Sequence, residues 1–180
     1  MDTDTRSAMA ALAYYTLSCG WLLLPAAAWN ILLAKQLPPA FQPDEFGRNI
    51  PAPLAFAENG LRIAVFMLPF LMPLDMAAPG AGRALLVFGA GTLLYFASWL
   101  ALIGLPGSRW SRCALGFAAP AYTPLLWLLG IALLGDRLFW GTFYRWWMYG
   151  VLCVAFLAAH ITHTMRVYFR NPQPGVTAAR

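Results

Sequence analysis

The sequence predicts an all-α polytopic membrane protein, a bundle of five transmembrane helices that forms a single domain over residues 1–180. Of the 180 residues, 61% are hydrophobic and only 11% are charged, whereas an ordinary soluble domain is about a quarter charged. The mean hydropathy is +0.62, and five apolar stretches are long enough to cross about 30 Å of hydrocarbon. A chain of this length would bury only about 70% of its unfolded surface in water, so several stretches are expected to face lipid.

The first expected span covers about residues 8–34. A basic Arg6, the apolar run and the small residues 26–28 are also typical of a cleavable signal peptide. Two aspartates dilute the positive charge at the start, however, and the apolar run continues through residues 29–33. We therefore expect a retained first helix.

The other four expected spans are residues 53–74, 82–105, 114–134 and 146–167. Proline lacks an N–H group and clashes with the preceding turn. We therefore expect Pro69 and Pro73 to bend the outer half of the second span, and Pro120 and Pro124 to bend the middle of the fourth. The stretch GAG, residues 89–91, favours close helix packing in the third span.

Aromatic residues mark the start of the fifth span, where the segment LFWGTFYRWWMYG, residues 138–150, holds seven of them. Amphipathic rings prefer the headgroup layer, so this segment is expected to form an interfacial belt. An aromatic box for a ligand is the alternative interpretation.

The distribution of Lys and Arg predicts the orientation. The loops and tail on one side carry seven of these residues and those on the other side carry four, with Arg62 left out because it lies within a span. The positive-inside rule then places the N-terminus outside and the C-terminus in the cytoplasm, in what we expect to be a bacterial inner membrane. The basic residues follow no nucleic-acid-binding pattern, so membrane lipids are their expected partners.

Polar residues from different spans share one depth. At about 1.5 Å per residue, they lie roughly 6 to 14 Å from the cytoplasmic end of their spans. Intramembrane polar residues usually face the bundle interior or a wet cavity, so the sequence predicts a pocket in this half of the membrane. Its expected ligand-binding residues are Asn30, Glu58, Asn59, Arg62, Tyr122, His160 and His163.

Glu58 and Arg62 are spaced i, i+4 on the second span, which places them on one helix face. The pair can neutralise itself and hold the second span against the fifth. Alternatively, Arg62 binds an anionic head group or a carboxylate while Glu58 orients it.

His160 and His163 are spaced i, i+3, so both imidazoles can face the same pocket. With Glu58 they are weak candidates for a metal site, and the sequence identifies no cofactor. Proton or substrate handling and interhelical hydrogen bonds are the other interpretations. The chain has only these two His residues, and two imidazoles on one helix cannot ligate opposite faces of one haem, so a bis-histidine haem within the chain is excluded.

The sequence contains no GxSxG, P-loop, GxGxxG or HExxH motif. The first hypothesis is therefore a membrane protein whose pocket binds or moves a small anionic or lipidic ligand. A second is a non-catalytic membrane subunit that binds a protein partner, and a homo-oligomer is equally open. A third is a membrane enzyme that uses His160 or His163 as a base or a metal ligand. The Pro-rich first loop is expected to form a flap beneath the polar layer. A connector that rests on the headgroups is the alternative interpretation.

Overall fold

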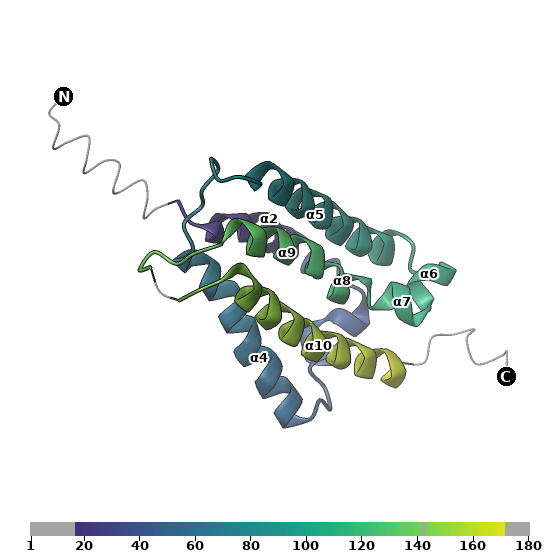
Figure 1. Cartoon of the computed structure of the whole chain (residues 1–180). Coiled ribbons are helices and arrows are strands. Elements are labelled where there is room, and N and C mark those ends of the chain that lie inside the picture. Colours follow the sequence, from purple (N-terminus) through teal and green to yellow (C-terminus); the bar gives the residue numbers. More distant parts are fainter. Residues whose placement is uncertain (1–16, 142, 172–180) are drawn as a thin grey trace, which may run out of the picture.

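The computed structural model describes residues 17–141 and 143–171. Within these ranges the regular structure is helical, apart from one isolated bridge between Ser18 and Pro73. The elements are η1 (Cys19–Leu23), α2 (Leu24–Leu33), η2 (Pro39–Phe41), α3 (Pro43–Phe46), α4 (Ala52–Met67), η3 (Leu68–Leu71), α5 (Ala81–Gly104), α6 (Arg109–Arg112), α7 (Ala114–Phe117), α8 (Ala119–Tyr122), α9 (Pro124–Leu134) and α10 (Trp146–Arg170). The predicted all-α class is confirmed (Figure 1).

Three helices of the described residues are long and apolar enough to cross a membrane, namely Ala52–Leu71, Ala81–Gly104 and Trp146–Arg170. They correspond to the second, third and fifth predicted spans. The other two predicted spans contain shorter apolar helices, Cys19–Leu33 and Ala119–Leu134. The part of the first predicted span before residue 17 lies outside the described residues. A helical bundle with membrane-length helices is thus confirmed.

Large apolar side chains lie on the outside of the bundle. Phe56, Ile31 and Leu86 have 83%, 76% and 73% of their surface exposed. Apolar surface in water costs about 25 cal/mol per Å², and large exposed apolar patches mark membrane or partner surfaces. These faces are suited to contact with lipid.

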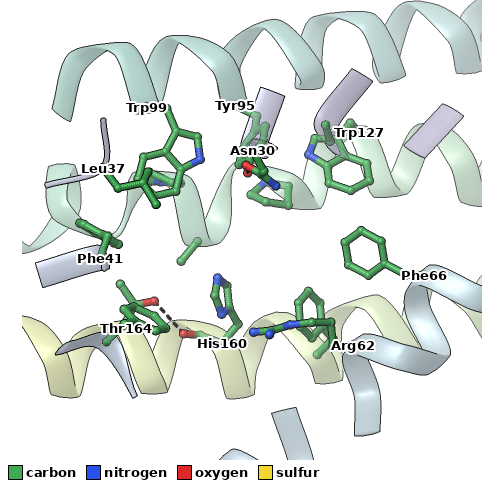
Figure 2. A pocket seen from close by; sticks show the side chains of 16 residues that line it. Asn30, Leu37, Phe41, Arg62, Phe66, Tyr95, Trp99, Trp127, His160 and Thr164 are labelled. Atoms are coloured by element: carbon green, nitrogen blue, oxygen red, sulfur yellow. Dashed lines mark hydrogen bonds between the residues drawn. The ribbon is translucent and has the colours of Figure 1, made fainter. Parts of the chain in front are cut away.

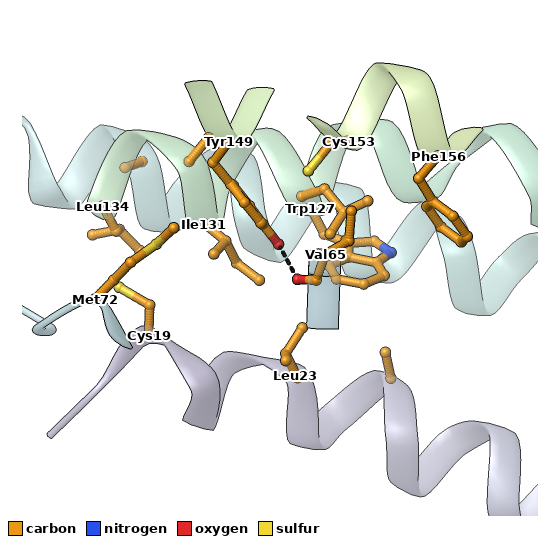
Figure 3. Close-up of a cluster of buried hydrophobic side chains, with 14 of the residues drawn as sticks. Cys19, Leu23, Val65, Met72, Trp127, Ile131, Leu134, Tyr149, Cys153 and Phe156 are labelled. Atoms are coloured by element: carbon orange, nitrogen blue, oxygen red, sulfur yellow. Dashed lines mark hydrogen bonds between the residues drawn. The ribbon is translucent and has the colours of Figure 1, made fainter. Parts of the chain in front are cut away.

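Helix α4 ends before the predicted span of residues 53–74 does, and Pro69 explains why. The chain continues as η3 and becomes extended at Met72, with φ −102° and ψ 120°. Pro69 has no N–H group to donate to the carbonyl of Val65, four residues earlier. The hydroxyl of Tyr149 on α10 donates to that carbonyl at 3.0 Å (Figure 3). The bend predicted at Pro69 is therefore the end of helix α4. There Tyr149 of α10 donates to the carbonyl that Pro69 leaves without a backbone donor.

The fourth predicted span, residues 114–134, consists of three helices rather than one. Helix α7 ends at Phe117, and α8 and α9 follow in sequence. Pro120 and Pro124 each lie in the first turn of a new helix, where the backbone N–H groups have no helical acceptor anyway. Pro120 and Pro124 do interrupt the fourth span, but they divide it into separate helices instead of bending one helix.

Helices α5 and α9 lie side by side (Figure 1) and pack closely at two glycines. A Cβ atom on Gly91 would lie 2.4 Å from the backbone nitrogen of Trp127. A Cβ atom on Gly130 would lie 2.6 Å from the Cα of Phe88. Gly89, in contrast, has nothing within 4 Å of its Cβ position. The close packing predicted for the third span therefore depends on Gly91.

The main core lies where α4, α9, α10 and η1 meet (Figure 3). Val65, Met72, Ile131 and Tyr149 are fully buried there. Cys19 and Cys153 are unpaired and buried in the same core, as small apolar side chains would be. This core fixes α4 against α10, which positions the polar residues described next.

Candidate functional site

The centre of the candidate site is the carboxylate of Glu58 on α4, which is 1% exposed. Helix α4 packs against α10 and turns Glu58 toward it. The i, i+4 spacing places Arg62 on the same face, and its Nη2 forms an ion pair with Glu58 Oε1. A buried carboxylate is costly unless it is paired and hydrogen-bonded, so its remaining partners define the site.

Two imidazoles from α10 complete the surroundings of this carboxylate. His160 Nδ1 lies 2.9 Å from Oε1 of Glu58, and His163 Nδ1 lies 2.5 Å from Oε2. The ring of His160 stacks on Phe156 one turn earlier, with centroids 5.5 Å apart. We call Glu58, Arg62, His160 and His163 the Glu58 cluster. Through it, one carboxylate joins α4 to two positions of α10.

His163 has a second partner in the loop before α4. Its Nε2 lies 3.0 Å from the carbonyl oxygen of Phe46, and the two rings stack with centroids 4.2 Å apart. A carbonyl oxygen only accepts hydrogen bonds, so we assign a proton to Nε2. Since Nδ1 faces the carboxylate of Glu58, a further proton must lie between these two groups. It resides either on the imidazole or on the carboxyl.

The protons on these side chains determine the net charge of the Glu58 cluster. An imidazolium beside a carboxylate and a neutral imidazole beside a carboxylic acid have the same summed charge of zero. His160 is neutral when its Nδ1–H donates to Glu58 and its Nε2 is unprotonated. Arg62 then leaves one positive charge in excess. A single cation within hydrocarbon costs about 2.5 to 3.5 kcal/mol on insertion scales, so an anion beside the cluster would be stabilising.

A cavity of about 350 Å³ opens beside the cluster (Figure 2). Arg62 and His160 lie on the wall that α4 and α10 form. Tyr95, Trp99 and Trp127 lie on the opposite wall, which α5 and α9 form. His160 Nε2 has no hydrogen-bond partner in the part of the chain that the structure describes, and Figure 2 shows the ring directed into the cavity. The cavity thus separates a charged wall from an aromatic one.

The aromatic wall also carries hydrogen-bonding groups. The hydroxyl of Tyr95 donates to Oδ1 of Asn30 on α2 at 2.6 Å. The indole Nε1 atoms of Trp99 and Trp127 are buried and have no hydrogen-bond partner among the described residues. Buried donors are usually paired, and although both tryptophans line the cavity, their Nε1 atoms lie beneath its surface.

The loop of residues 37–50 covers one end of the cavity, which Phe41 and Phe46 help to line. Phe41 stacks on Phe117 of α7, with centroids 4.6 Å apart. Arg170, at the end of α10, donates to two backbone carbonyls of this loop. The loop is therefore a structured flap that contacts the C-terminal end of α10, as the sequence predicts for the first loop.

The structure brings four of the seven predicted site residues into direct contact, and these form the Glu58 cluster. Asn30 lines the cavity from the other side. Asn59 is exposed, and its Oδ1 lies 3.5 Å from Nη1 of Arg62. Tyr122 does not line the cavity. Its neighbours Ala121 and Pro124 do line the cavity, and its role at the pocket stays a prediction.

Sequence analysis missed Trp99 and Trp127 as site residues. Both lie in long apolar runs, where a tryptophan is readily interpreted as facing lipid. Their position in the middle of a span was the available signal, because tryptophan in membrane proteins is enriched at the interfaces.

The weak metal candidates Glu58, His160 and His163 do lie together, but as a hydrogen-bonded cluster. Both Nδ1 atoms are directed at the carboxylate, and His163 Nε2 is directed at a backbone carbonyl. Within residues 17–141 and 143–171, no group of three or more His, Cys, Asp or Glu side chains is arranged so that it could hold a metal ion.

Comparison with known proteins gives no relative: no family model matches the sequence, and no curated protein or solved structure matches it significantly. The fold and the site therefore define the protein only by class. It is an all-helical membrane-type bundle with a buried carboxylate, two imidazoles and a guanidinium beside an internal cavity.

Proposed function

We propose that this chain is an integral protein of the bacterial inner membrane in which all five apolar segments cross the bilayer. Helices α7 and α8 continue the line of α9, so that residues 114–134 form one interrupted span. The contact of Arg170 with the loop of residues 37–50 supports this topology, because five spans bring the first loop and the C-terminus to one side. The excess of Lys and Arg on that side supports a cytoplasmic C-terminus.

We propose further that the cavity beside the Glu58 cluster binds a small anionic or lipidic ligand, which the protein holds or moves. One observation carries the proposal: the single carboxylate of Glu58 is shared by three basic side chains, so basic groups outnumber acidic ones in the cluster beside the cavity. Near the flap, Glu45 lies 2.8 Å from Arg48 and 3.8 Å from Arg170, so one carboxylate is shared there by two guanidinium groups.

The cavity itself supports this function. Its volume of about 350 Å³ falls within the range of small-molecule sites, which combine apolar walls with a few polar groups. Its polar groups belong to five different helices, α2, α4, α5, α9 and α10, so a ligand would bridge several elements of the bundle.

The test is the thermal stability of the protein in phosphatidylcholine nanodiscs. The probes are 4-methoxycinnamate, dodecanoate and inorganic phosphate, which represent aromatic, lipidic and inorganic anions. We expect at least one probe to raise the Tm saturably, because a ligand at a hundredfold excess over its Kd stabilises by about 2.7 kcal/mol.

Two variants make this test specific. Arg62→Met should abolish the rise in Tm while leaving membrane insertion intact. Arg166→Met removes an exposed guanidinium from α10 and should behave as the parent protein does. The proposal is wrong if none of the three anions raises the Tm, or if Arg62→Met responds as the parent does.

A further inference from the structure

We infer that the ligand is an aromatic monocarboxylate that carries a second hydrogen-bond acceptor at the far end of its ring. This assignment rests on the proposed function, since it names the ligand class of the same cavity. Four features of the cavity lead to it: the charge of one wall, the shape of the free donor, the rings of the lining, and an unpaired donor on the opposite wall.

The charge of the Glu58 cluster matches a ligand with one negative charge. With His160 neutral, the cluster has a single positive charge in excess, wherever the proton between Glu58 and His163 resides. A phosphate monoester carries about −1.5 to −2 at neutral pH, which would leave negative charge beside the buried carboxylate of Glu58. A monoanion neutralises the cluster without that repulsion.

The shape of the donor favours a carboxylate. Nη2 of Arg62 is engaged by Glu58, while Nη1 has only the distant Oδ1 of Asn59 at 3.5 Å. The side chain is 43% exposed and lines the cavity, so one edge of its guanidinium is free for a ligand. Planar carboxylates match planar guanidinium groups. Some diacyl phospholipids also carry one net negative charge, but their glycerol and two acyl chains exceed a cavity of about 350 Å³.

The lining of the cavity favours an aromatic body. The ring centroid of Phe156 lies 6.0 Å from Cζ of Arg62. Phe66 lies near Arg62 as well, and Tyr95 lies on the opposite wall (Figure 2). Aromatic rings attract one another in offset and edge-to-face arrangements. A flat ring between these walls makes such contacts on both faces, whereas a flexible alkyl chain gains only burial.

Trp127 requires the second acceptor. Its side chain is 3% exposed, and its indole Nε1 has no hydrogen-bond partner among the described residues. The indole N–H group only donates, and a buried donor without an acceptor is unfavourable. Figure 2 shows the indole on the wall opposite Arg62. A ligand that spans the cavity with its carboxylate at Arg62 would place its far end at Trp127, whose buried N–H group must turn toward the cavity to donate to it.

The test compares matched ligands by calorimetry in neutral nanodiscs. The reference ligand is 4-methoxycinnamate, whose ether oxygen is the second acceptor. We expect 4-methoxycinnamamide, which lacks the charge, to bind about 10-fold more weakly or worse, because hydrogen bonds to charged groups are the strong ones. We expect 4-ethylcinnamate, in which a methylene replaces the ether oxygen, to bind about fivefold more weakly.

Variants assign each difference to a side chain. Trp127→Phe should bind the methoxy and ethyl compounds equally well, and Arg62→Lys should weaken both because it loses the planar donor. The inference is overturned if the amide binds as tightly as the acid, or if Trp127→Phe keeps the preference for the methoxy compound. If Trp127→Phe does not insert, the amide and ethyl comparisons on the parent protein decide.

The thermal-shift panel separates this inference from the proposed function. A rise in Tm with dodecanoate or phosphate but not with 4-methoxycinnamate would overturn the aromatic monocarboxylate and leave anion binding in place. No rise with any of the three anions would overturn both.

Discussion

His163 and Phe46 contact each other twice, through stacked rings with centroids 4.2 Å apart and through His163 Nε2, which lies 3.0 Å from the Phe46 carbonyl oxygen. The same imidazole faces Glu58 through Nδ1 at 2.5 Å. One side chain of α10 thus connects the flap over the cavity to the buried carboxylate of α4. The position of the flap therefore depends on the hydrogen bonds of the Glu58 cluster.

The first prediction concerns this connection. His163→Phe keeps a ring against Phe46 and removes both hydrogen bonds. We expect the backbone amides of residues 43–48 to exchange hydrogen about 5- to 30-fold faster, because a lost hydrogen bond of about 1 to 2 kcal/mol changes an equilibrium by that factor. Hydrogen–deuterium exchange mass spectrometry in nanodiscs measures the effect.

Thr162→Ala is the matched control for His163→Phe. The Thr162 hydroxyl is exposed and donates only to the carbonyl of Ala158 in its own helix, so exchange in the flap should stay at the parent rate. Equal protection of residues 43–48 in His163→Phe and the parent would show that His163 does not hold the flap.

The second prediction concerns the buried charge. Glu58→Gln keeps the shape of the side chain but removes the charge that balances Arg62. We expect a loss of about 3 to 5 kcal/mol in the free energy of unfolding, which is typical when one partner of a buried ion pair is removed. Reversible unfolding of the purified protein in mixed micelles measures this difference.

Asp75→Asn provides the comparison for Glu58→Gln. Asp75 pairs with Arg137 at 2.8 Å, but 36% and 50% of the two side chains are exposed. Exposed pairs contribute about 0 to 1 kcal/mol, so this acid-to-amide change should cost little. Similar losses for the two variants would mean that the charge of Glu58 is not what stabilises the contact between α4 and α10.

The Glu58 cluster could be predicted from the sequence because helix geometry fixes its spacings. Glu58 and Arg62 share a face at i, i+4, and His160 and His163 do so at i, i+3. Charges in hydrocarbon need partners, and in a five-span bundle these residues fall at one depth. Depth and spacing were therefore sufficient to associate two helices that are far apart in the sequence.

The rest of the site depends on how helices rotate and end, which spacing does not fix. Tyr122 has a suitable depth, yet it is not among the residues that line the cavity, whereas its neighbours Ala121 and Pro124 are. Trp127 gains its role from the face of α9 that meets Gly91. Tyr149 completes the end of α4 only because packing brings its hydroxyl to the Val65 carbonyl. These relationships are tertiary, so a single sequence does not predict them.

The third prediction concerns the end of α4. Tyr149→Phe removes the donor to the Val65 carbonyl and leaves this buried acceptor unpaired, which should cost about 1 to 3 kcal/mol in the free energy of unfolding. Pro69→Ala supplies a backbone N–H at the position that donates to Val65 in a regular helix. We therefore expect Tyr149→Phe to cost less in the Pro69→Ala background, and a double-mutant cycle measures the difference.

A cycle with no coupling would contradict this account of the α4 end. It would mean that the Tyr149 hydroxyl and the missing N–H of Pro69 act independently, and that the stability of the core there comes from packing of the aromatic ring alone.

The fourth prediction uses two glycines on one helix. Gly91→Ala places a Cβ atom 2.4 Å from the backbone nitrogen of Trp127, so α5 and α9 must move apart. Overpacking of this kind typically costs about 1 to 3 kcal/mol. Gly89→Ala meets nothing within 4 Å and should be neutral or stabilise by up to about 1 kcal/mol, because alanine is the better helix former. Thermal unfolding of both variants in nanodiscs measures the contrast.

Since Trp127 lines the cavity, Gly91→Ala should also weaken the binding of 4-methoxycinnamate, while Gly89→Ala should bind it as the parent does. If the two variants are equally stable, backbone contact at Gly91 does not determine how α5 and α9 pack.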